Sequence, residues 1–329
     1  MAFEPIATKW VKAAAISTSV AAAVYLATVS WVGRADVSAA LKLVSADTLI
    51  ALLALSTINY GVRFLRWHYY LHMLGNFISI RHDLRIYIGG FALTTTPGKA
   101  GEMARSLWLQ PYGVPAASSL AAFFAERIQD FLVILILSSL GASLYPGGKW
   151  LLLGSFAMVL IALLVLSVPA ITQSVLRSIA VHRQSMQAFG RRIADILLLT
   201  RDCLTPARFV LGLAGGVCAW SAEALGFYIL MPALGHPLPL LPAISIYAFS
   251  MLAGALSFMP GGLGGSEAAM IVLLRLSGIP MPIAVSATLL IRLATLWFAV
   301  LLGIVALSIR AKIPLPAAAP PASTPAGAG

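Results

Sequence analysis

The segment Pro97-Gly98-Lys99-Ala100-Gly101-Glu102 decides the fold, because a related segment, Pro260-Gly261-Gly262-Leu263-Gly264-Gly265-Ser266-Glu267, follows in the second half of the chain. Each segment interrupts strongly apolar sequence. Arg127 lies 25 residues after Glu102, and Arg292 lies 25 residues after Glu267. A proline-glycine break, a glutamate and an arginine in both halves of a membrane protein indicate a duplicated site near the membrane midplane, a common construction in transporters.

The composition places the chain among polytopic helical membrane proteins. Of its 329 residues, 60% are hydrophobic and 10% are charged, and the mean hydropathy is +0.93. No soluble domain has that balance. The net charge of +11 is expected to set orientation and to meet anionic headgroups, and no nucleic-acid partner is expected. The two cysteines, Cys203 and Cys218, fit neither a disulfide framework nor a metal site, and no cofactor is expected.

Hydropathy predicts the membrane segments. Two apolar stretches, 84–110 and 241–278, break at the proline-glycine segments, and each arm is shorter than the about 20 residues of a full span. We therefore predict an all-α polytopic membrane protein in which these stretches form re-entrant hairpins of half-helices, with full crossing as the open alternative. Uninterrupted spans are predicted at 11–33 (an uncleaved first helix), 47–70, 116–144, 149–170, 208–233 and 282–309.

Basic residues predict the orientation of the chain. The linker 171–207 carries five arginines against two aspartates, which places it in the cytoplasm by the positive-inside rule. Counting crossings from this linker places both termini in the cytoplasm, opens hairpin 84–110 inward and opens hairpin 241–278 outward.

The domain organisation follows from that count. Repeat one, about 47–144, and repeat two, about 208–309, are predicted to be inverted relative to each other. Both belong to a single transmembrane domain, 1–312. The Pro/Ala-rich tail, 313–329, is expected to be disordered.

The breaks have a chemical consequence. Proline removes a helix donor and glycine loosens the backbone, so one half-helix ends and another begins at Pro97, Gly98, Pro260, Gly261 and Gly262. The second half-helix points its free N–H groups at the break, which favours an anion such as a phosphate or carboxylate. The alternative is that these residues merely kink a membrane helix.

The charged residues beside the breaks are expensive in a membrane. Glu102, Arg127, Glu267 and Arg292 would each cost about 2.5–3.5 kcal/mol at a helix centre, so they must be paired or hydrated. Two interpretations stay open and are compatible. Glu102 pairs with Arg127 and Glu267 with Arg292 to lock each hairpin, or the arginines hold a lipid phosphate while the glutamates hold a cation or proton. Further candidates for substrate binding are Arg105 and Glu223.

Other polar residues suggest weaker hypotheses. Glu126 and Asp130 share a helix face and form either a proton path or local neutralising pairs. Arg63 and Arg66 are expected to extend to the headgroups. The sequence has no nucleophile elbow, P-loop, HExxH motif or dinucleotide fingerprint, so no enzymatic activity is expected.

Four motifs in order resemble the lysylphosphatidylglycerol synthase transmembrane-region family over roughly residues 10–310. The resemblance implies movement of an amphipathic lipid between leaflets. The soluble aminoacyl-transferase domain of the two-part synthases is not expected, and some standalone members are associated with hopanoid or isoprenoid-linked glycan biosynthesis. The motifs are Asn59-x3-Arg63-x2-Arg66-Trp67, Pro97-Gly98-Lys99-x-Gly101-Glu102-x2-Arg105, Glu126-Arg127-x2-Asp130 and Pro260-Gly261-Gly262-x-Gly264-x2-Glu267.

The combined expectation is a lipid flippase of the cell inner membrane. It would move an anionic or zwitterionic lipid, of phospholipid or isoprenoid type, with membrane lipids and lipid-biosynthetic membrane enzymes as its partners. One alternative is a secondary transporter for a small solute or ion, which predicts a closed polar cavity. The other is a non-transporting accessory protein in lipid, hopanoid or glycan biosynthesis.

Overall fold

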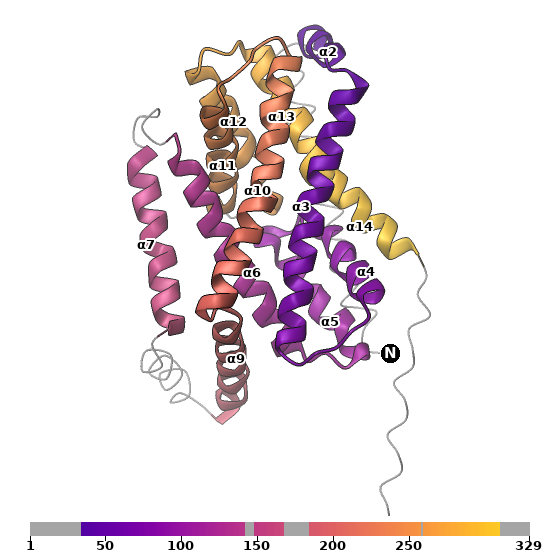
Figure 1. The fold of residues 1–329 in the computed structure, drawn as a ribbon, viewed down its shortest axis with the longest axis vertical. Coiled ribbons are helices and arrows are strands. Elements are labelled where there is room, and N and C mark those ends of the chain that lie inside the picture. Colours follow the sequence, from indigo (N-terminus) through magenta and orange to yellow (C-terminus); the bar gives the residue numbers. More distant parts are fainter. Residues whose placement is uncertain (1–33, 142–147, 168–183, 258, 310–329) are drawn as a thin grey trace, which may run out of the picture.

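A computed structural model describes residues 34–141, 148–167, 184–257 and 259–309 (Figure 1). Within these ranges every regular element is helical, which confirms the predicted class. The predicted span 11–33, the tail 313–329 and the start of the linker lie outside the described residues. Three described helices are long and apolar enough to cross a membrane: Ala46–Met73, Pro206–Ala233 and Met281–Ser308.

The first half runs from α2 to α7, and α9 leads into the second half. Its elements are α2 (Arg34–Lys42), α3 (Ala46–Met73), α4 (Ile80–Phe91), η1 (Pro97–Ala104), α5 (Arg105–Leu109), η2 (Gln110–Tyr112), α6 (Ala116–Ser139), α7 (Gly148–Ser167) and α9 (Gln184–Cys203). The second half comprises α10 (Pro206–Ala233), α11 (Leu240–Leu256), η4 (Pro260–Gly262), α12 (Gly265–Leu276), α13 (Met281–Arg292), η5 (Leu293–Trp297) and α14 (Phe298–Ser308).

The two halves repeat the same local order. Helices α3 and α10 are each 28 residues long and begin at positions 46 and 206, 160 apart. Each ends in a tight turn through a glycine of positive φ, 79° at Gly75 and 78° at Gly235. The broken segment and another long helix then follow in both halves, as the duplicated motif predicts.

Helices α3 and α10 pack against each other in antiparallel directions. The side-chain amide of Asn59 donates to the carbonyl of Ala219 at 2.8 Å, and Arg66 donates to the carbonyl of Gly212 at 3.2 Å. Arg66, which follows Asn59 in α3, therefore contacts Gly212, which precedes Ala219 in α10. In Figure 1, α4 and α5 lie near one end of this pair and α11 and α12 near the other.

Both predicted breaks are present, and they touch. After α4 the chain turns through residues 92–96 and continues as the 3-10 segment η1, while α11 ends before the short 3-10 turn η4. Gly261 and Gly262 have φ values of 62° and 69°, which residues with a Cβ rarely adopt. A Cβ built on Gly261 would lie 3.4 Å from the Cα of Thr95, so the two breaks meet in the middle of the protein.

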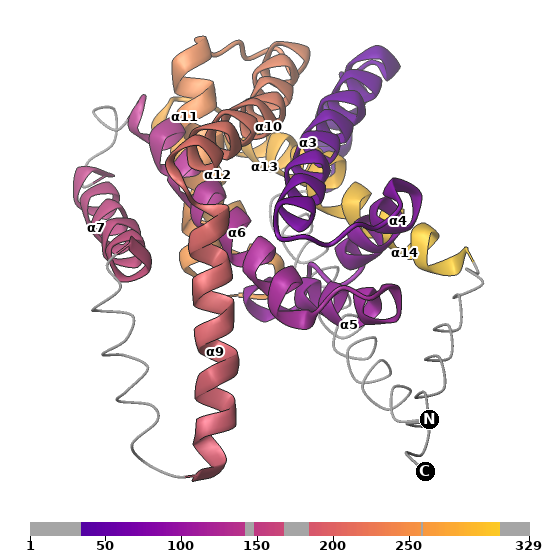
Figure 2. The same ribbon diagram turned by 60° about the horizontal axis from the view of Figure 1, so that its bottom comes forward.

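Three features of the fold were not predicted from hydropathy. Residues 34–46, between the predicted spans 11–33 and 47–70, contain the helix α2, and the linker contains α9, which packs on α6 and extends from one end of the bundle (Figure 2). The last span is divided by η5, a π-helical turn that begins directly after Arg292. Such turns frequently lie at functional sites.

The two largest apolar clusters of the core are separated by a charged layer along α6. Ala125 belongs to the cluster around Trp67, Tyr70 and Tyr87. Val133 belongs to the other cluster, around α10, α11 and α12. Residues 126–130 of α6, which carry the charges, separate the two clusters.

Candidate functional site

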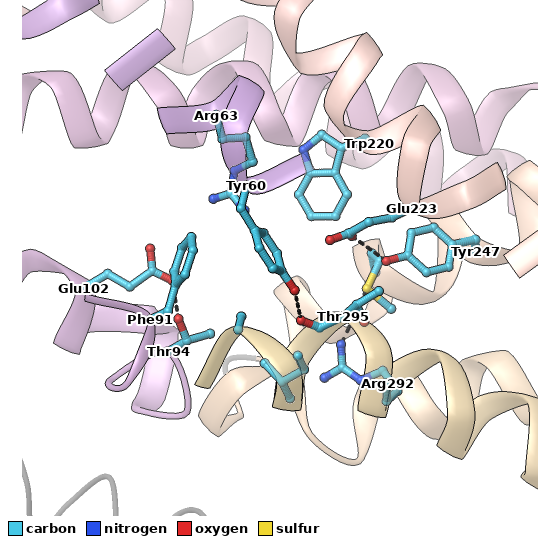
Figure 3. A pocket seen from close by; sticks show the side chains of 13 residues that line it. Tyr60, Arg63, Phe91, Thr94, Glu102, Trp220, Glu223, Tyr247, Arg292 and Thr295 are labelled. Carbon is cyan, nitrogen blue, oxygen red and sulfur yellow. Dashed lines mark hydrogen bonds between the residues drawn. The ribbon is translucent and has the colours of Figure 1, made fainter. Parts of the chain in front are cut away.

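A small cavity lies where the two halves meet (Figure 3). Its volume is about 60 Å³, which is room for a few water molecules. Of the described residues that line it, four are charged, two of each sign. The lining residues are Tyr60, Arg63, Phe91, Thr94, Glu102, Trp220, Glu223, Tyr247, Met251, Arg292, Thr295, Leu296 and Ala299.

Equivalent positions of the two halves face this cavity. With the spacing of 160 that relates α3 to α10, Tyr60 corresponds to Trp220, and Arg63 corresponds to Glu223. The second pair has opposite charges. The cavity therefore lies between equivalent surfaces of the two halves. One of the equivalent positions is positively charged in the first half and negatively charged in the second.

Glu102 lies on the cavity wall and is almost fully buried. The hydroxyl of Thr94 donates to its Oε1 at 2.8 Å, and Arg105 donates from Nη2 to its Oε2 at 3.2 Å. The predicted pair of Glu102 with Arg127 is therefore wrong. Because η1 leads directly into α5, Arg105 lies one helical turn after Glu102 and forms the ion pair with it.

Arg105 lies behind Glu102 in a cage of aromatic rings. Its guanidinium carbon lies 4.1 Å from the ring centroid of Tyr87, 5.4 Å from that of Phe91 and 5.6 Å from that of Trp67. Its Nε and Nη1 have no hydrogen-bond partner among the described residues, so the ring faces stabilise this buried cation in addition to the ion pair with Glu102.

Arg127 belongs to a separate cluster around Asp130. Its Nη2 lies 3.1 Å from Oδ2 of Asp130. Arg66 approaches the same carboxylate at 2.5 Å and Arg63 approaches it at 3.5 Å, so three described arginines share one aspartate. Arg66 also lies 3.5 Å from Glu126.

The expected extension of Arg63 and Arg66 to the headgroups is wrong, because both side chains are buried. Helix α10 covers both, Arg63 with the ring of Trp220 and Arg66 with a glycine. A Cβ on Gly216 would lie 3.0 Å from Nη1 of Arg66. The acids of α6 therefore neutralise arginines from another helix, in addition to the local contact with Arg127.

The pair of Glu267 and Arg292 is confirmed. The Nε of Arg292 donates to Oε1 of Glu267 at 2.7 Å, and its Nη2 donates to the carbonyl of Gly261 at 3.1 Å. Oε2 of Glu267 accepts from the backbone N–H of Gly264 at 2.7 Å. The anion expected at the N-terminus of α12 is thus the carboxylate of Glu267 itself.

Glu223 lies on the opposite wall from Glu102 (Figure 3). The hydroxyl of Tyr247 donates to its Oε2 at 2.6 Å. The side chain of Tyr60 extends across the cavity, and its hydroxyl donates to the carbonyl of Thr295 in the π-helical turn. Glu223, a candidate for substrate binding in the sequence analysis, therefore lies on the wall of the cavity between the two halves.

The structure brings together three of the six predicted site residues on the cavity wall: Glu102, Glu223 and Arg292. Arg105 lies behind Glu102, and Glu267 lies behind Arg292. Arg127 is connected to the cavity through Asp130 and then Arg63.

Sequence reasoning missed several uncharged lining residues, namely Tyr60, Tyr247 and Thr295. The repeat spacing of 160 carries a signal for two of them, because it aligns Tyr60 with Trp220 and Tyr247 with Tyr87. Within the described ranges, no group of three His, Cys, Asp or Glu side chains is placed to hold a metal ion.

Comparison with known proteins identifies the family. Two membrane proteins of the UPF0104 group from Methanothermobacter thermautotrophicus are similar to this chain. One is 25% identical over 303 residues, covering 84% of this chain and 89% of the relative. The other is 26% identical over 299 residues, covering 84% and 88%. The model of the lysylphosphatidylglycerol synthase transmembrane region matches residues 10–303, so this chain is a membrane protein that belongs to that family.

Proposed function

We propose that this protein moves an anionic or zwitterionic lipid between the leaflets of the cell inner membrane. The observation that carries the proposal is the charged cavity at the junction of the two halves, beside the point where the two helix breaks touch. Transporters built from repeats commonly place their substrate site at such a junction, on discontinuous helices.

The cavity has the chemistry to read a headgroup. Arg63 and Arg292 supply guanidinium groups to its wall, and a guanidinium can hold a phosphate or carboxylate through two parallel hydrogen bonds. Glu102 and Glu223 supply negative charge for a cationic group of a zwitterionic lipid. Phosphate of a phospholipid or of an isoprenoid lipid would meet the same arginines.

The proposal includes a topology. The two broken segments are re-entrant hairpins of two inverted repeats, one opening to each side, and both termini are cytoplasmic. The position of α4 and α5 near one end of the α3–α10 pair, and of α11 and α12 near the other, supports this arrangement (Figure 1). The protein acts without chemical conversion of the lipid, and its partners are membrane lipids and the membrane enzymes that make them.

One observation favours a second candidate, a transporter of a small solute or ion. A cavity of about 60 Å³ has room for a few water molecules and not for a lipid headgroup, so lipid transport requires a wider conformation. A small-solute transporter needs less widening. A purely accessory role remains the third alternative, in which the buried charge pairs only hold the fold together.

The test is leaflet exchange in proteoliposomes containing the purified protein. The probes are headgroup-labelled phosphatidylglycerol, its lysyl ester and an isoprenoid phosphate. The variants Arg63→Lys and Arg292→Lys keep the charge and lose the planar fork. Arg81→Lys is the matched control, because Arg81 is exposed and lies at the start of α4, whereas Phe91 of the cavity wall lies at the end of that helix.

The proposal expects at least one probe to move with the wild-type protein and with Arg81→Lys, and to move several-fold more slowly with the two cavity variants. Uptake of a small phosphate or carboxylate solute without lipid movement would favour the second candidate. Absence of both activities, at good incorporation, would favour the accessory role.

A further inference from the structure

Glu223 occupies an unusual place in the molecule. Its carboxylate lies on the wall of a cavity of water-molecule size, in the middle of the long apolar helix α10. Its equivalent in the first half is Arg63, on the same cavity. An ionisable residue within a membrane helix is a candidate for proton or ion transfer when it faces a water-accessible cavity.

The groups around Glu223 come from each helix packed on this part of α10. Helix α11 contributes Tyr247, whose hydroxyl donates to the carboxylate at 2.6 Å. Helix α3 contributes Tyr60 and Arg63, and α13 contributes Arg292 (Figure 3). Helix α6 contributes the Asp130 cluster, which contacts α10 near Gly212 and Gly216, seven or more residues along the helix from Glu223.

The charges on the cavity wall balance only while Glu223 is ionised. Of the described lining residues, Arg63 and Arg292 carry two positive charges, and Glu102 and Glu223 carry two negative charges. Glu102 bonds to Arg105, and Arg292 bonds to Glu267, so each of these two is held in an ion pair whose other member lies behind the wall. Protonation of Glu223 would change the net charge of the wall from zero to plus one.

We propose that Glu223 is a proton-binding site that couples proton binding to the binding of the anionic group of the substrate. A proton passes from water in the cavity to a carboxylate oxygen of Glu223, and no other bond changes. The neutral acid keeps Tyr247 as a hydrogen-bond partner, and the cavity wall, with Arg63 and Arg292 as its cations, then carries a net positive charge that attracts an anion. This inference rests on the transport part of the proposed function, for a lipid or for a smaller anion.

Reciprocity makes the coupling measurable. If the proton raises the affinity for the anion, then the anion raises the affinity for the proton by the same factor. One linked proton can change the apparent affinity by at most about tenfold for each pH unit. Binding of substrate is therefore expected to strengthen as the pH falls, until Glu223 is fully protonated.

The first experiment measures protonation directly and needs no transport. Infrared difference spectra of the purified protein across neutral pH are expected to show the carbonyl band of a buried carboxylic acid. The band should be absent from Glu223→Gln and retained in Asp47→Asn, a control in which an exposed acid is removed. Tyr247→Phe, which keeps the acid and removes its hydrogen bond, should shift the frequency of the band. A pH-dependent band that is unchanged in Glu223→Gln and in Tyr247→Phe would overturn the inference.

The second experiment measures coupling in proteoliposomes, with headgroup-labelled phosphatidylglycerol as the probe. Where binding of the lipid limits the rate, the wild-type protein should move the lipid faster at lower pH, up to about tenfold for each pH unit. Glu223→Gln, a neutral mimic of the protonated acid, should move it at a rate that does not depend on pH. The same pH dependence in both proteins would contradict the inference. If the infrared band titrates but no lipid moves in any protein, the lipid function fails and the proton site stands.

Discussion

Arg292 and Glu267 are joined at 2.7 Å although 25 residues separate them, and the same arginine bonds to the carbonyl of Gly261 in the helix break. One guanidinium therefore ties α13 to the break itself and to α12, the helix that follows the break. The contact explains how an irregular segment is held in the middle of the protein. It also places a cation on the wall of the central cavity.

The ion pair should be costly to break on one side. Arg292→Ala leaves the Glu267 carboxylate buried without its guanidinium, and removal of one partner of a buried pair costs about 3–5 kcal/mol. Unfolding in mixed micelles should show this loss of stability. The double variant Arg292→Ala/Glu267→Ala should lose clearly less than the sum of the two single variants, and strict additivity would contradict a direct interaction.

Asp130 should be needed for folding because three described arginines approach it. Asp130→Asn keeps the shape and removes the negative charge, which leaves surplus positive charge buried between α3 and α6. We expect a loss of about 3–5 kcal/mol, measured in the same way. Asp47→Asn, at an exposed site in the first turn of α3, should change stability by less than about 1 kcal/mol. Equal effects of the two substitutions would refute the role of Asp130.

Even a methyl side chain at Gly303 should destabilise the fold. A Cβ at this position would lie 2.2 Å from the backbone nitrogen of Ala92, so Gly303→Ala must move α14 away from the turn after α4. The expected cost is about 1–3 kcal/mol, as for other overpacked sites. Gly61→Ala is the control, because a Cβ on this helical glycine meets nothing within 4 Å. It should be neutral or should stabilise by up to about 1 kcal/mol. A thermal melt that shows no difference between the two variants would contradict this packing.

Cys203, at the end of α9 in the linker, should resist modification. Burial raises the pKa of its thiol to about 12, so the reactive thiolate is scarce at neutral pH. Because the pKa of the Cys203 thiol is raised, the thiol stays protonated at neutral pH. A reactive thiolate forms only at alkaline pH. Maleimide labelling of a Cys218→Ala variant should be slow in the folded protein and fast after denaturation. Rapid labelling of the folded protein at neutral pH would show that the linker end is open.

The helices were the most predictable part of the fold because long apolar runs and proline-glycine breaks are local signals. The predicted span 47–70 matches α3, Ala46–Met73, within a few residues, and the break at Pro260 ends α11 as expected. The π-helical turn after Arg292 has no local signal, since the apolar run 282–309 is continuous in composition.

The site was less predictable because burial of charge depends on the partner helix. Arg63 and Arg66 look like headgroup-facing residues until α10 covers them, and glycines such as Gly216 make that contact possible. Arg127 and Arg292 each lie 25 residues after a glutamate, which suggested that Glu102 pairs with Arg127 as Glu267 pairs with Arg292. The two halves differ here, because Arg105 follows Glu102 within one turn and no arginine stands at the matching position after Glu267.

The central claim is that lipid crosses the membrane through this protein. The most direct test is whether labelled lipid in the inner leaflet stays protected from a reductant added outside. Proteoliposomes carrying fluorescent headgroup-labelled phosphatidylglycerol in both leaflets are treated with an impermeant reductant. We predict that the protected inner-leaflet fraction disappears with the wild-type protein and persists in protein-free liposomes and with Arg63→Lys/Arg292→Lys. A protected fraction that persists with well-incorporated wild-type protein, for this probe, its lysyl ester and an isoprenoid phosphate, and with a pH gradient in either direction, would contradict the account.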